Sequence, residues 1–446
     1  NTYFYPSVSG SIVVSELVKM PVVSFLKLRA SYANVGSALT SSTIGPTYYI
    51  MGDDFLGYGA DYYSAYEGPS FANSASYNIL FPYNNQPAAA YTNTIPNPNL
   101  EPSFSSAWEV GADIRFLKNK LGFDVTYFNS LDGPGIFRLP VSNAAGYDNA
   151  LVNGIKTERT GWEIAATAIP VASPNGFKWD VMANWSTYKE VLNEIYPGVE
   201  KYNTYLKVGD RMDKIYGSAF VRTQDGELVV DGSGRTFNNP VRQFLGYANP
   251  DWSWSIRNNF SYKGFTFGFQ FDGRVGGKIV NHVQRQTFRG GRHIETVEGA
   301  MGEARYQDYK GVKSWLVDGK VISNGAKINY DADGNIINFN ELQFADNTTK
   351  TYLQDYISRY YNSDEGNLMS RSYAKLREIT ISYQLPSKLL GNSFIRSASI
   401  SLIGRNLLYF AEKKDIDLDQ YADTRSTSNM QTPTMRRYGL NLNITF

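Results

Sequence analysis

The sequence predicts an all-β protein whose antiparallel strands form a transmembrane β-barrel. Three observations lead to this fold class. Apolar and polar residues alternate along many segments of about ten residues, aromatic residues are frequent in a chain that is polar on average, and short turns alternate with long loops. The chain has 446 residues, of which 15% are aromatic, and a mean hydropathy of -0.36. Alternation hides an apolar face from hydropathy averaging, whereas aromatic girdles raise the content of Tyr, Phe and Trp.

Composition argues against several other classes of protein. No run approaches the ~18 apolar residues that a spanning helix needs, which argues against an α-helical membrane protein. The formal net charge of +1 provides no bulk basic field for nucleic acid. The absence of cysteine excludes disulfides, thiolate metal sites and cysteine nucleophiles, and it is typical of an exported protein. Because the sequence opens at Asn1 inside an apparent strand without a signal peptide, we expect an N-terminal part to be absent.

The N-terminal part of the chain contains the clearest strand pattern. Strands are expected near Tyr3 to Val14 and from Phe25 to Tyr32. From Trp108 to Phe116, even positions are apolar and odd positions are charged or glycine. Successive side chains of a strand point to opposite faces, so one face can contact lipid and the other water. A turn at Lys118–Lys120 then leads to an alternating strand from Leu121 to Phe128, which predicts a hairpin.

The same pattern continues to the C-terminus and gives about eleven strands of the ~10-residue length expected for a tilted barrel strand. The further strands are Trp162–Ala168, Phe177–Ser186, Trp252–Arg257, Phe265–Asp272, Ile379–Leu385, Ala398–Leu402 and Tyr438–Phe446. Within the Phe265–Asp272 strand, four phenylalanines share one face. An apolar face of this kind is not expected to be exposed to water.

The connections between these strands fall into two classes. Short turns follow the strands that end near Val14, Phe116, Ile169, Tyr262 and Leu385. Long segments lie near residues 33–105, 130–155, 190–250, 276–371 and 411–434. This alternation is typical of periplasmic turns and extracellular loops. Because bacterial single-chain barrels have even strand numbers, we expect residues 1–446 to be the C-terminal part of a plugged barrel of ~22 strands, without its plug.

A soluble β-sandwich or β-propeller is the structural alternative, because its strands also alternate. Its outer face would be polar and its buried face aliphatic. Here one face is rich in Trp, Tyr and Phe near strand ends, the other carries charged and amide side chains, and five connections are unusually long. The sequence therefore favours the membrane barrel.

Several motifs occur in an order and spacing that resemble one known family, the SusC/RagA-type TonB-dependent transporters. The motifs are Tyr5–Ser9 before Leu26–Tyr32, Asn97–Pro102 before Trp108–Gly111, Gly161–Glu163, Asn249–Trp252, Tyr373–Pro386, Gly404–Leu408 and Gly439–Phe446. The resemblance covers essentially the whole chain. The acidic stretch Asp415–Asp417 departs from it, because many members have Asp-Pro-Glu there, and the plug and the TonB-contacting segment are not in these residues.

The resemblance implies a 22-stranded barrel with a plug in the Gram-negative outer membrane. It also implies a SusD-type surface lipoprotein that closes over the extracellular mouth, and energy supplied by the TonB complex. The cargo would be an oligosaccharide or an oligopeptide. The partners expected on this basis are the lipoprotein, the N-terminal barrel half with its plug, TonB and outer-membrane lipid, with no nucleic acid and no cofactor.

Three sets of residues are the candidates for function. Flat aromatic rings that could stack on cargo, or contact the lipoprotein lid, are Tyr58, Tyr62, Tyr63, Tyr66 and Phe71. Wall charges expected to face the lumen and the plug are Glu109, Asp113, Arg115, Asp124, Arg257 and Asp272. The terminal Phe446 resembles the C-terminal aromatic residue that the barrel-assembly machinery recognises, and it also suits a lipid-facing position.

Other patterns do not predict chemistry. The stretch that begins at Asp331 starts like a calcium loop but has Ile336 where glycine is required, so a hairpin turn at Asp333–Gly334 is expected instead. His282 and His293 lack metal-ligand spacing and are interpreted as solvated loop residues, without catalytic or metal-binding roles. The sequence therefore predicts a transporter and not an enzyme such as a lipase. A structural or docking barrel in a larger surface complex remains an alternative function.

Overall fold

The computed structural model describes residues 4–37, 75, 77–391, 394–421 and 432–446. Its main feature is a sheet of eleven strands in the order β1-β2-β6-β7-β10-β11-β15-β16-β23-β24-β25. The strands are β1 (Ser7–Val13), β2 (Val23–Ser37), β6 (Ser103–Phe116), β7 (Leu121–Gly133), β10 (Lys156–Ala172), β11 (Lys178–Glu194), β15 (Trp252–Tyr262), β16 (Phe265–Val275), β23 (Tyr373–Gln384), β24 (Ser397–Ala411) and β25 (Arg437–Thr445). Each of the eleven strands expected from the alternation is confirmed.

Several strands are longer than the alternation predicted. β2 continues to Ser37, β7 to Gly133 and β11 to Glu194, so each enters a segment expected to be a loop. At the ends of β7 and β11, polar residues occupy both faces, which removes the alternating signal although the strand continues. None of the helices in the described residues has the length and apolar character needed to cross a bilayer.

The chain divides into two compact units. Unit 1 contains residues 1–115, 124–162 and 188–212, and unit 2 contains residues 116–123, 163–187 and 213–446. In unit 1, the short helix α1 (Val14–Leu17) joins β1 to β2, which pair antiparallel from Ser7 with Ala33 to Val13 with Lys27. The connecting segments of this unit form a hairpin of β3 (Tyr77–Tyr83) and β4 (Gln86–Tyr91), and a small sheet of β5 (Thr94–Ile95), β9 (Asn149–Gly154) and β8 (Gly135–Pro140) with the turn η3 (Asn143–Ala145).

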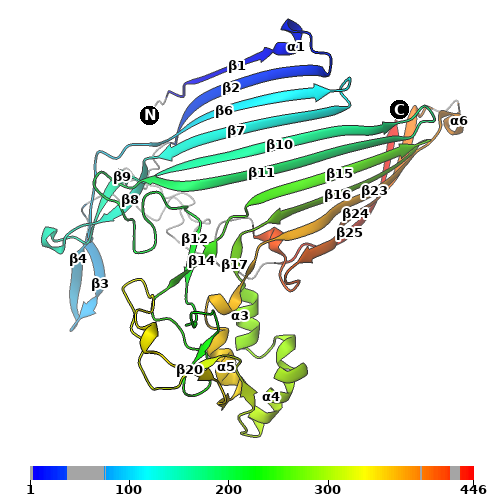
Figure 1. The fold of residues 1–446 in the computed structure, drawn as a ribbon. Coiled ribbons are helices and arrows are strands. Elements are labelled where there is room, and N and C mark those ends of the chain that lie inside the picture. The colour runs from blue at the N-terminus through cyan, green and yellow to red at the C-terminus, as the bar shows by residue number, and fades with distance from the viewer. Residues whose placement is uncertain (1–3, 38–74, 76, 392–393, 422–431) are drawn as a thin grey trace. The chain divides into compact units, whose positions relative to one another are not determined.

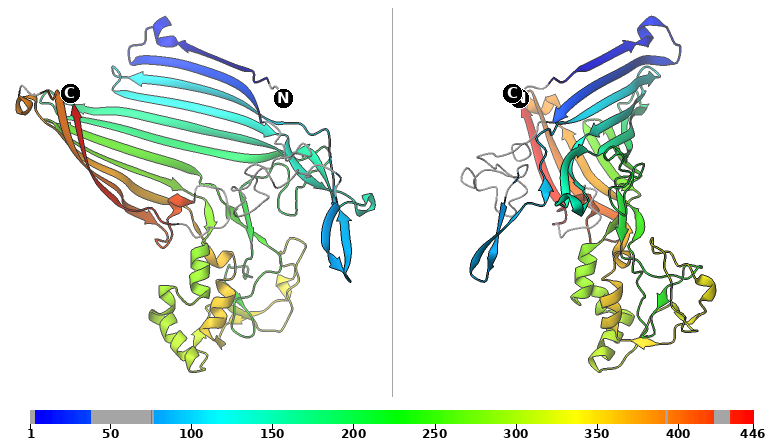
Figure 2. Two further views of the ribbon diagram at one scale, coloured as in Figure 1. Left: turned by 180° about the vertical axis from the view of Figure 1, so that it is seen from behind. Right: turned by 90° about the vertical axis from the view of Figure 1, so that its left-hand side faces the viewer.

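In unit 2, β15, β16, β23, β24 and β25 lie side by side (Figures 1 and 2). Lys263 and Gly264, with φ angles of 46° and 85°, form the tight turn between β15 and β16. Phe267 and Phe269 pack their rings on Phe260 of β15, with centroids 6.2 Å apart in each case. Phe265 and Phe267 nevertheless remain 56% and 39% exposed, so this aromatic face is not covered within the described residues. The short helix α6 (Ser387–Leu390) follows β23.

A β-bulge in β23 changes which side chains share a face. Leu376 pairs with Phe271 of β16, but Glu378 pairs with the preceding residue, Gln270, so Arg377 is the extra residue. The register against β24 also shifts here, but the extra residue then lies in β24, because Leu376 pairs with Leu408 and Glu378 with Arg405. A bulge of this kind reverses the alternation beyond it. Lys375 therefore pairs with Asp272 on the polar face.

The segments 213–250 and 276–371 form one compact body within unit 2, called here the loop lobe. Its strands are β12 (Lys214–Gly217), β13 (Val229–Val230), β14 (Gln243–Tyr247), β17 (Lys278–Val280), β18 (Trp315–Leu316), β19 (Lys320–Ile322), β20 (Phe344–Asp346), β21 (Lys350–Thr351) and β22 (Leu368–Ser370). Its helical elements are α3 (His282–Arg289), η4 (Ile294–Thr296), α4 (Gly299–Tyr309), η5 (Phe339–Glu341), α5 (Leu353–Tyr360) and η6 (Glu365–Asn367).

The loop lobe has its own core, which joins residues far apart in the sequence. β13 pairs in parallel with β19, which joins the segment 213–250 to the segment 276–371. Phe288 of α3, Ala304 of α4 and Leu353 of α5 are buried in one apolar cluster. Figures 1 and 2 show these three helices together beyond one end of the unit 2 strands. Burial of such clusters is the main source of stability in a body of this kind.

Candidate functional site

Four of the six charges predicted for the polar face of the sheet, Asp113, Arg115, Asp124 and Asp272, form ion pairs. In unit 1, Arg29 of β2 reaches Asp124 of β7, with Nη1–Oδ2 and Nη2–Oδ1 distances of 2.9 and 2.5 Å. Its guanidinium lies over Gly111 of β6, where a Cβ atom would be 2.8 Å from Arg29 Nε. Asp113 pairs with Arg115 of the same strand at 2.9 Å. Glycine at position 111 thus leaves room for an arginine that spans three strands.

The remaining predicted wall residues lie as follows. Glu109 is an exposed residue of β6, and Arg257 is an exposed residue of β15. In unit 2, Asp272 of β16 accepts hydrogen bonds of 2.9 and 2.5 Å from Arg377 of β23. The structure therefore places Asp113, Asp124 and Asp272 in ion pairs with arginines. Whether these residues face a plug remains a prediction.

The Asp272 pair belongs to a larger network that the sequence did not reveal. Asp419 accepts from Arg377 Nη1 at 2.7 Å and from Lys375 Nζ at 3.2 Å. Lys375 also donates to Asp417 Oδ1 at 3.0 Å, and its side chain is only 2% exposed. Buried charges are tolerated when they are paired and hydrogen-bonded, as they are here. The network ties β16 and β23 to the segment that follows β24.

We call that segment, residues 412–421, the strap. Its turn η7 (Leu418–Gln420) is capped by the side chain of Asp417, and Ile416, Leu418 and Tyr421 are buried against Tyr373 and Met369. Arg371, 2% exposed, donates to the carbonyl oxygens of Ala248 and Tyr421. The strap is therefore packed and hydrogen-bonded against both the sheet and the loop lobe within unit 2.

The electrostatics of the strap keep its two carboxyl groups ionised. Hydrogen bonds from Arg377 hold the pKa of Asp419 well below its usual range, against the effect of burial. Burial by itself would raise the pKa of Asp417, but hydrogen bonds from Thr434 and Lys375 lower it overall. Both carboxylates thus remain charged partners of Lys375 and Arg377 at neutral pH.

A second ionic junction holds the loop lobe together. Asp364 accepts from the backbone N–H of Ser218 at 2.8 Å and pairs with Arg285 at 2.7 Å. Glu365 accepts from the backbone N–H of Phe220 at 2.6 Å and pairs with Arg222 at 2.7 Å. The bonds to Ser218, Phe220 and Arg222 connect the region after α5 to a segment about 145 residues earlier in the chain, and the pair with Arg285 connects it to α3.

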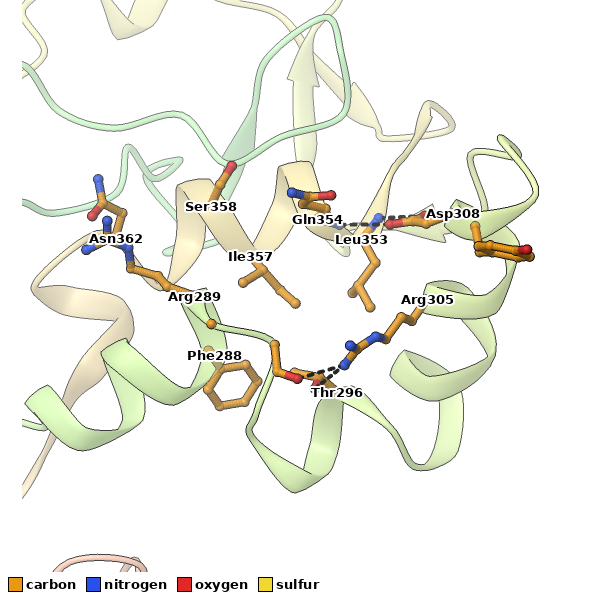
Figure 3. Close-up of a pocket in the computed structure, with 13 residues that line it drawn as sticks. Phe288, Arg289, Thr296, Arg305, Asp308, Leu353, Gln354, Ile357, Ser358 and Asn362 are labelled. Atoms are coloured by element: carbon orange, nitrogen blue, oxygen red, sulfur yellow. Dashed lines mark hydrogen bonds between the residues drawn. The ribbon is translucent and has the colours of Figure 1, made fainter.

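The loop lobe also contains a cleft of about 540 Å³ between α3, α4 and α5. Figure 3 shows Phe288, Leu353 and Ile357 at its centre, Arg289 and Asn362 toward one end, and Arg305 beside Thr296. The cleft also includes Asp308 and the rim residue Tyr309, which is 87% exposed. Its volume is within the range of small-ligand sites. Sequence patterns gave no indication of it, because its walls come from separate helices.

The other predicted residues have the following positions. Tyr58, Tyr62, Tyr63, Tyr66 and Phe71 lie outside the described residues. Phe446 is 66% exposed and stacks on Phe394, with centroids 5.4 Å apart.

The hairpin turn predicted at Asp333–Gly334 is confirmed. The backbone N–H of Asp331 donates to the carbonyl oxygen of Asn335, and Tyr330 and Ile336 form an antiparallel β-bridge. Of the two histidines predicted to be solvated loop residues, His282 begins α3. The prediction is wrong for His293, which is half-buried and stacks on buried Phe288 with ring centroids 4.0 Å apart. In the part of the chain that the structure describes, no group of three or more His, Asp or Glu residues could hold a metal ion.

Comparison with known proteins identifies similar chains, although no family model matches. Two TonB-dependent receptors of Formosa agariphila, P3 and P26, are each 20% identical to this chain, over 393 and 388 residues. Each match covers 78% of this chain and 35% of the relative, so the chain spans about a third of their length. In the structure of the RagAB peptide transporter, one chain is similar with a TM-score of 0.64 and 16% identity, over 99% of this chain and 43% of that chain. The RagAB peptide importer in its closed-closed state gives a TM-score of 0.63.

Proposed function

We propose that this chain, a member of the TonB-dependent receptor family of the Gram-negative outer membrane, forms the C-terminal half of a transport barrel. The barrel imports oligomeric nutrients, either glycans or peptides, together with a SusD-type surface lipoprotein. It is driven by TonB and acts as a transporter, not as an enzyme. The remaining strands and the plug belong to a part of the protein outside these residues.

One observation carries the proposal: the eleven strands expected from two-residue alternation are all present in one sheet. Strands with an apolar and a polar face are suited to a wall between lipid and an aqueous lumen. In β16 the apolar face carries Phe265, Phe267, Phe269 and Phe271, and the pairing partner of Asp272 on the polar face is Lys375. The fold shared with a chain of the RagAB peptide transporter supports the same interpretation.

Transport in this proposal depends on differential binding of the cargo. The loops and the lipoprotein bind the oligomer outside, and TonB changes the plug so that the cargo is released inward. The wall charges Glu109, Asp113, Arg115, Asp124, Arg257 and Asp272 contact the plug or the aqueous lumen. Charge reversal at Asp113 or Arg257 should then weaken the plug's protection from hydrogen exchange. Unchanged protection would contradict this role.

The experiment that tests the function is uptake of labelled oligomers by cells with and without the gene. We expect gene-dependent uptake of a peptide or glycan library, and loss of that uptake when the TonB complex is absent. The control is the outer-membrane level of the protein, which should not depend on TonB. Equal uptake in both strains, combined with loss of a surface complex in the gene-deleted strain, would instead indicate a structural barrel.

A further inference from the structure

We infer that the cleft between α3, α4 and α5 binds a carboxylate group of an oligopeptide. This inference rests on the proposed function and specifies which cargo the loop lobe recognises. It is based on two arginines that line the cleft, on the hydrogen bonds of the acidic residue there, and on the burial of the aromatic ring at its centre.

The two arginines provide the recognition chemistry. Arg305 Nη1 donates to the carbonyl oxygen of Gly291 at 2.8 Å and to Thr296 Oγ1 at 3.1 Å. These bonds fix the guanidinium, whereas its Nη2 and Nε make no hydrogen bond to other described residues. Arg289, exposed in the last turn of α3, has no ion-pair partner in the described part of the chain. Guanidinium groups bind carboxylates through charge-assisted, often paired, hydrogen bonds.

Asp308, the acidic residue of the cleft, does not act as the carboxylate partner of these arginines. Asp308 accepts hydrogen bonds from the backbone N–H groups of Leu353 and Gln354, at 3.1 and 2.9 Å. Both of its oxygens therefore bind the first turn of α5, where a negative charge is stabilised by the helix. Because Arg289 and Arg305 are the cationic lining residues and Asp308 the acidic one, the cleft keeps an excess positive charge.

The aromatic geometry favours a peptide over a sugar ring. Sugars bind proteins by stacking on open aromatic faces. At the centre of the cleft, however, one neighbour of Phe288 is His293 at 4.0 Å and the other is Tyr361 at 3.6 Å, both stacked on its ring. Phe288 is only 1% exposed, so its ring has no open face for a sugar. Tyr309 is the exposed aromatic residue of the cleft and lies at its rim.

Polar side chains along α5 suit the backbone of a peptide. Gln354 and Ser358 are exposed, lie four residues apart on one face of the helix, and line the cleft, as does Asn362 just after the helix. Their amide and hydroxyl groups can donate to and accept from peptide groups. Buried Leu353 and Ile357 form the apolar floor beside them (Figure 3). The occupant is thus an extended peptide, whose carboxylate binds a guanidinium group of this cleft, which Arg289 and Arg305 supply.

The test measures binding by the full-length protein, purified from the outer membrane in detergent. The probes are an N-terminally labelled peptide of Gly, Ser and Leu with a free C-terminal carboxylate, the same peptide with a C-terminal amide, and a labelled oligogalacturonate. The variants are Arg289→Gln and Arg305→Lys. The matched control is Arg292→Gln, which removes an exposed arginine of the same loop that does not line the cleft.

We expect the carboxylate peptide to bind roughly tenfold more tightly than its amide. Arg289→Gln should remove most of this preference, Arg305→Lys should reduce it, and Arg292→Gln should retain it. Equal affinity for acid and amide would overturn the inference, as would equal losses in Arg289→Gln and the control. Arginine-dependent binding of oligogalacturonate that exceeds peptide binding would also overturn it, because the occupant would then be an acidic glycan.

Failure of this inference can be distinguished from failure of the proposed function. If Arg289→Gln retains gene-dependent uptake of oligomers and the protein shows no preference for the carboxylate, only the cleft assignment is wrong. If no oligomer enters cells in a gene-dependent way, the transport function itself is wrong.

Discussion

Lys375 Nζ lies 3.0 Å from Asp417 Oδ1, and the two side chains are only 2% and 10% exposed. The pair joins a strand of the sheet to the strap across 42 residues of sequence. Because both charges are removed from water, each depends on the other for compensation. This relationship explains why the strap is held in one position against β23.

Removal of the lysine charge should release the strap. In Lys375→Met, Asp417 loses its cationic partner while the side-chain volume is nearly retained. Breaking a buried ion pair costs about 3–5 kcal/mol, so local opening of residues 416–421 should become much more frequent. Hydrogen exchange of the full-length protein measures this opening.

The control for this substitution is an exposed ion pair of similar length. Lys320 and Asp346 are 2.7 Å apart, but their side chains are 26% and 84% exposed. Lys320→Met should therefore leave exchange of its surroundings almost unchanged. Similar increases in exchange after both substitutions would show that burial does not determine the strength of the Lys375 pair.

Gly273 should be essential for the pairing of β16 with β23. A Cβ atom at this position would be 2.2 Å from the backbone carbonyl oxygen of Tyr373, which cannot move without separating the strands. Gly273→Ala should destabilise the sheet by about 1–3 kcal/mol. The measurement is the urea midpoint of unfolding from lipid vesicles. Gly439→Ala is the matched control in β25, where no atom lies within 4 Å of the added methyl group, and an equal effect of both changes would contradict the account.

Acid should weaken the loop lobe at Asp364. Burial alone would raise the pKa of this carboxyl, but hydrogen bonds from Arg285 and Ser218 lower it below its ordinary value of 3.8. A lowered pKa in the folded state means that the stabilisation is complete above the unfolded value and is lost as pH falls through the folded value. Hydrogen exchange near Ser218, corrected for intrinsic rates, should therefore stay constant at neutral pH and rise below about pH 4.

The variant Asp364→Asn tests the assignment of this pH dependence. The amide cannot form the ion pair with Arg285, so exchange should already be faster at pH 7. It should also depend less on pH, because the titrating group is gone. A profile parallel to that of the unmodified protein would assign the acid sensitivity to another carboxyl group.

The terminal aromatic residue should act in barrel assembly and not only through its ring contact. Phe446→Ala and Phe394→Ala each remove one member of the same stacked pair. If Phe446 is an assembly signal, its substitution lowers the amount of protein in the outer membrane several-fold, whereas Phe394→Ala has little effect. Quantitative blotting of outer-membrane fractions measures both, and equal losses would indicate that only the stacking matters.

The strands could be predicted from the sequence because each carries its own signal. The alternation along Phe265–Asp272 results directly from the two faces of the strand. The role of Lys375 could not be predicted, because extending the alternation from Ile379 backwards places it on the apolar face. The bulge at Arg377 reverses that pattern, and no local motif indicates it.

The loop lobe was not predicted for a different reason. Its core is formed by pairings such as Val229 with Lys320, which lie far apart in the chain and leave no periodic pattern. Asp364 and Asp417 resemble solvated loop acids in the sequence, and only the fold shows their partners. In the same way, Arg289 and Arg305 gain a common role only because α3 and α4 lie on the same cleft.

The two-faced nature of β16 is the central claim, and it can be tested directly because residues 1–446 contain no cysteine; any cysteine elsewhere in the protein would be replaced by serine. Single cysteines at Phe265, Thr266, Phe267, Phe269 and Gln270 of the full-length protein would carry nitroxide spin labels in outer-membrane vesicles. The account predicts that labels at 265, 267 and 269 collide with oxygen dissolved in lipid, whereas labels at 266 and 270 collide with a water-soluble nickel chelate. Contact with the same relaxing agent at all five positions, without a two-residue period, would contradict a strand that separates lipid from an aqueous lumen.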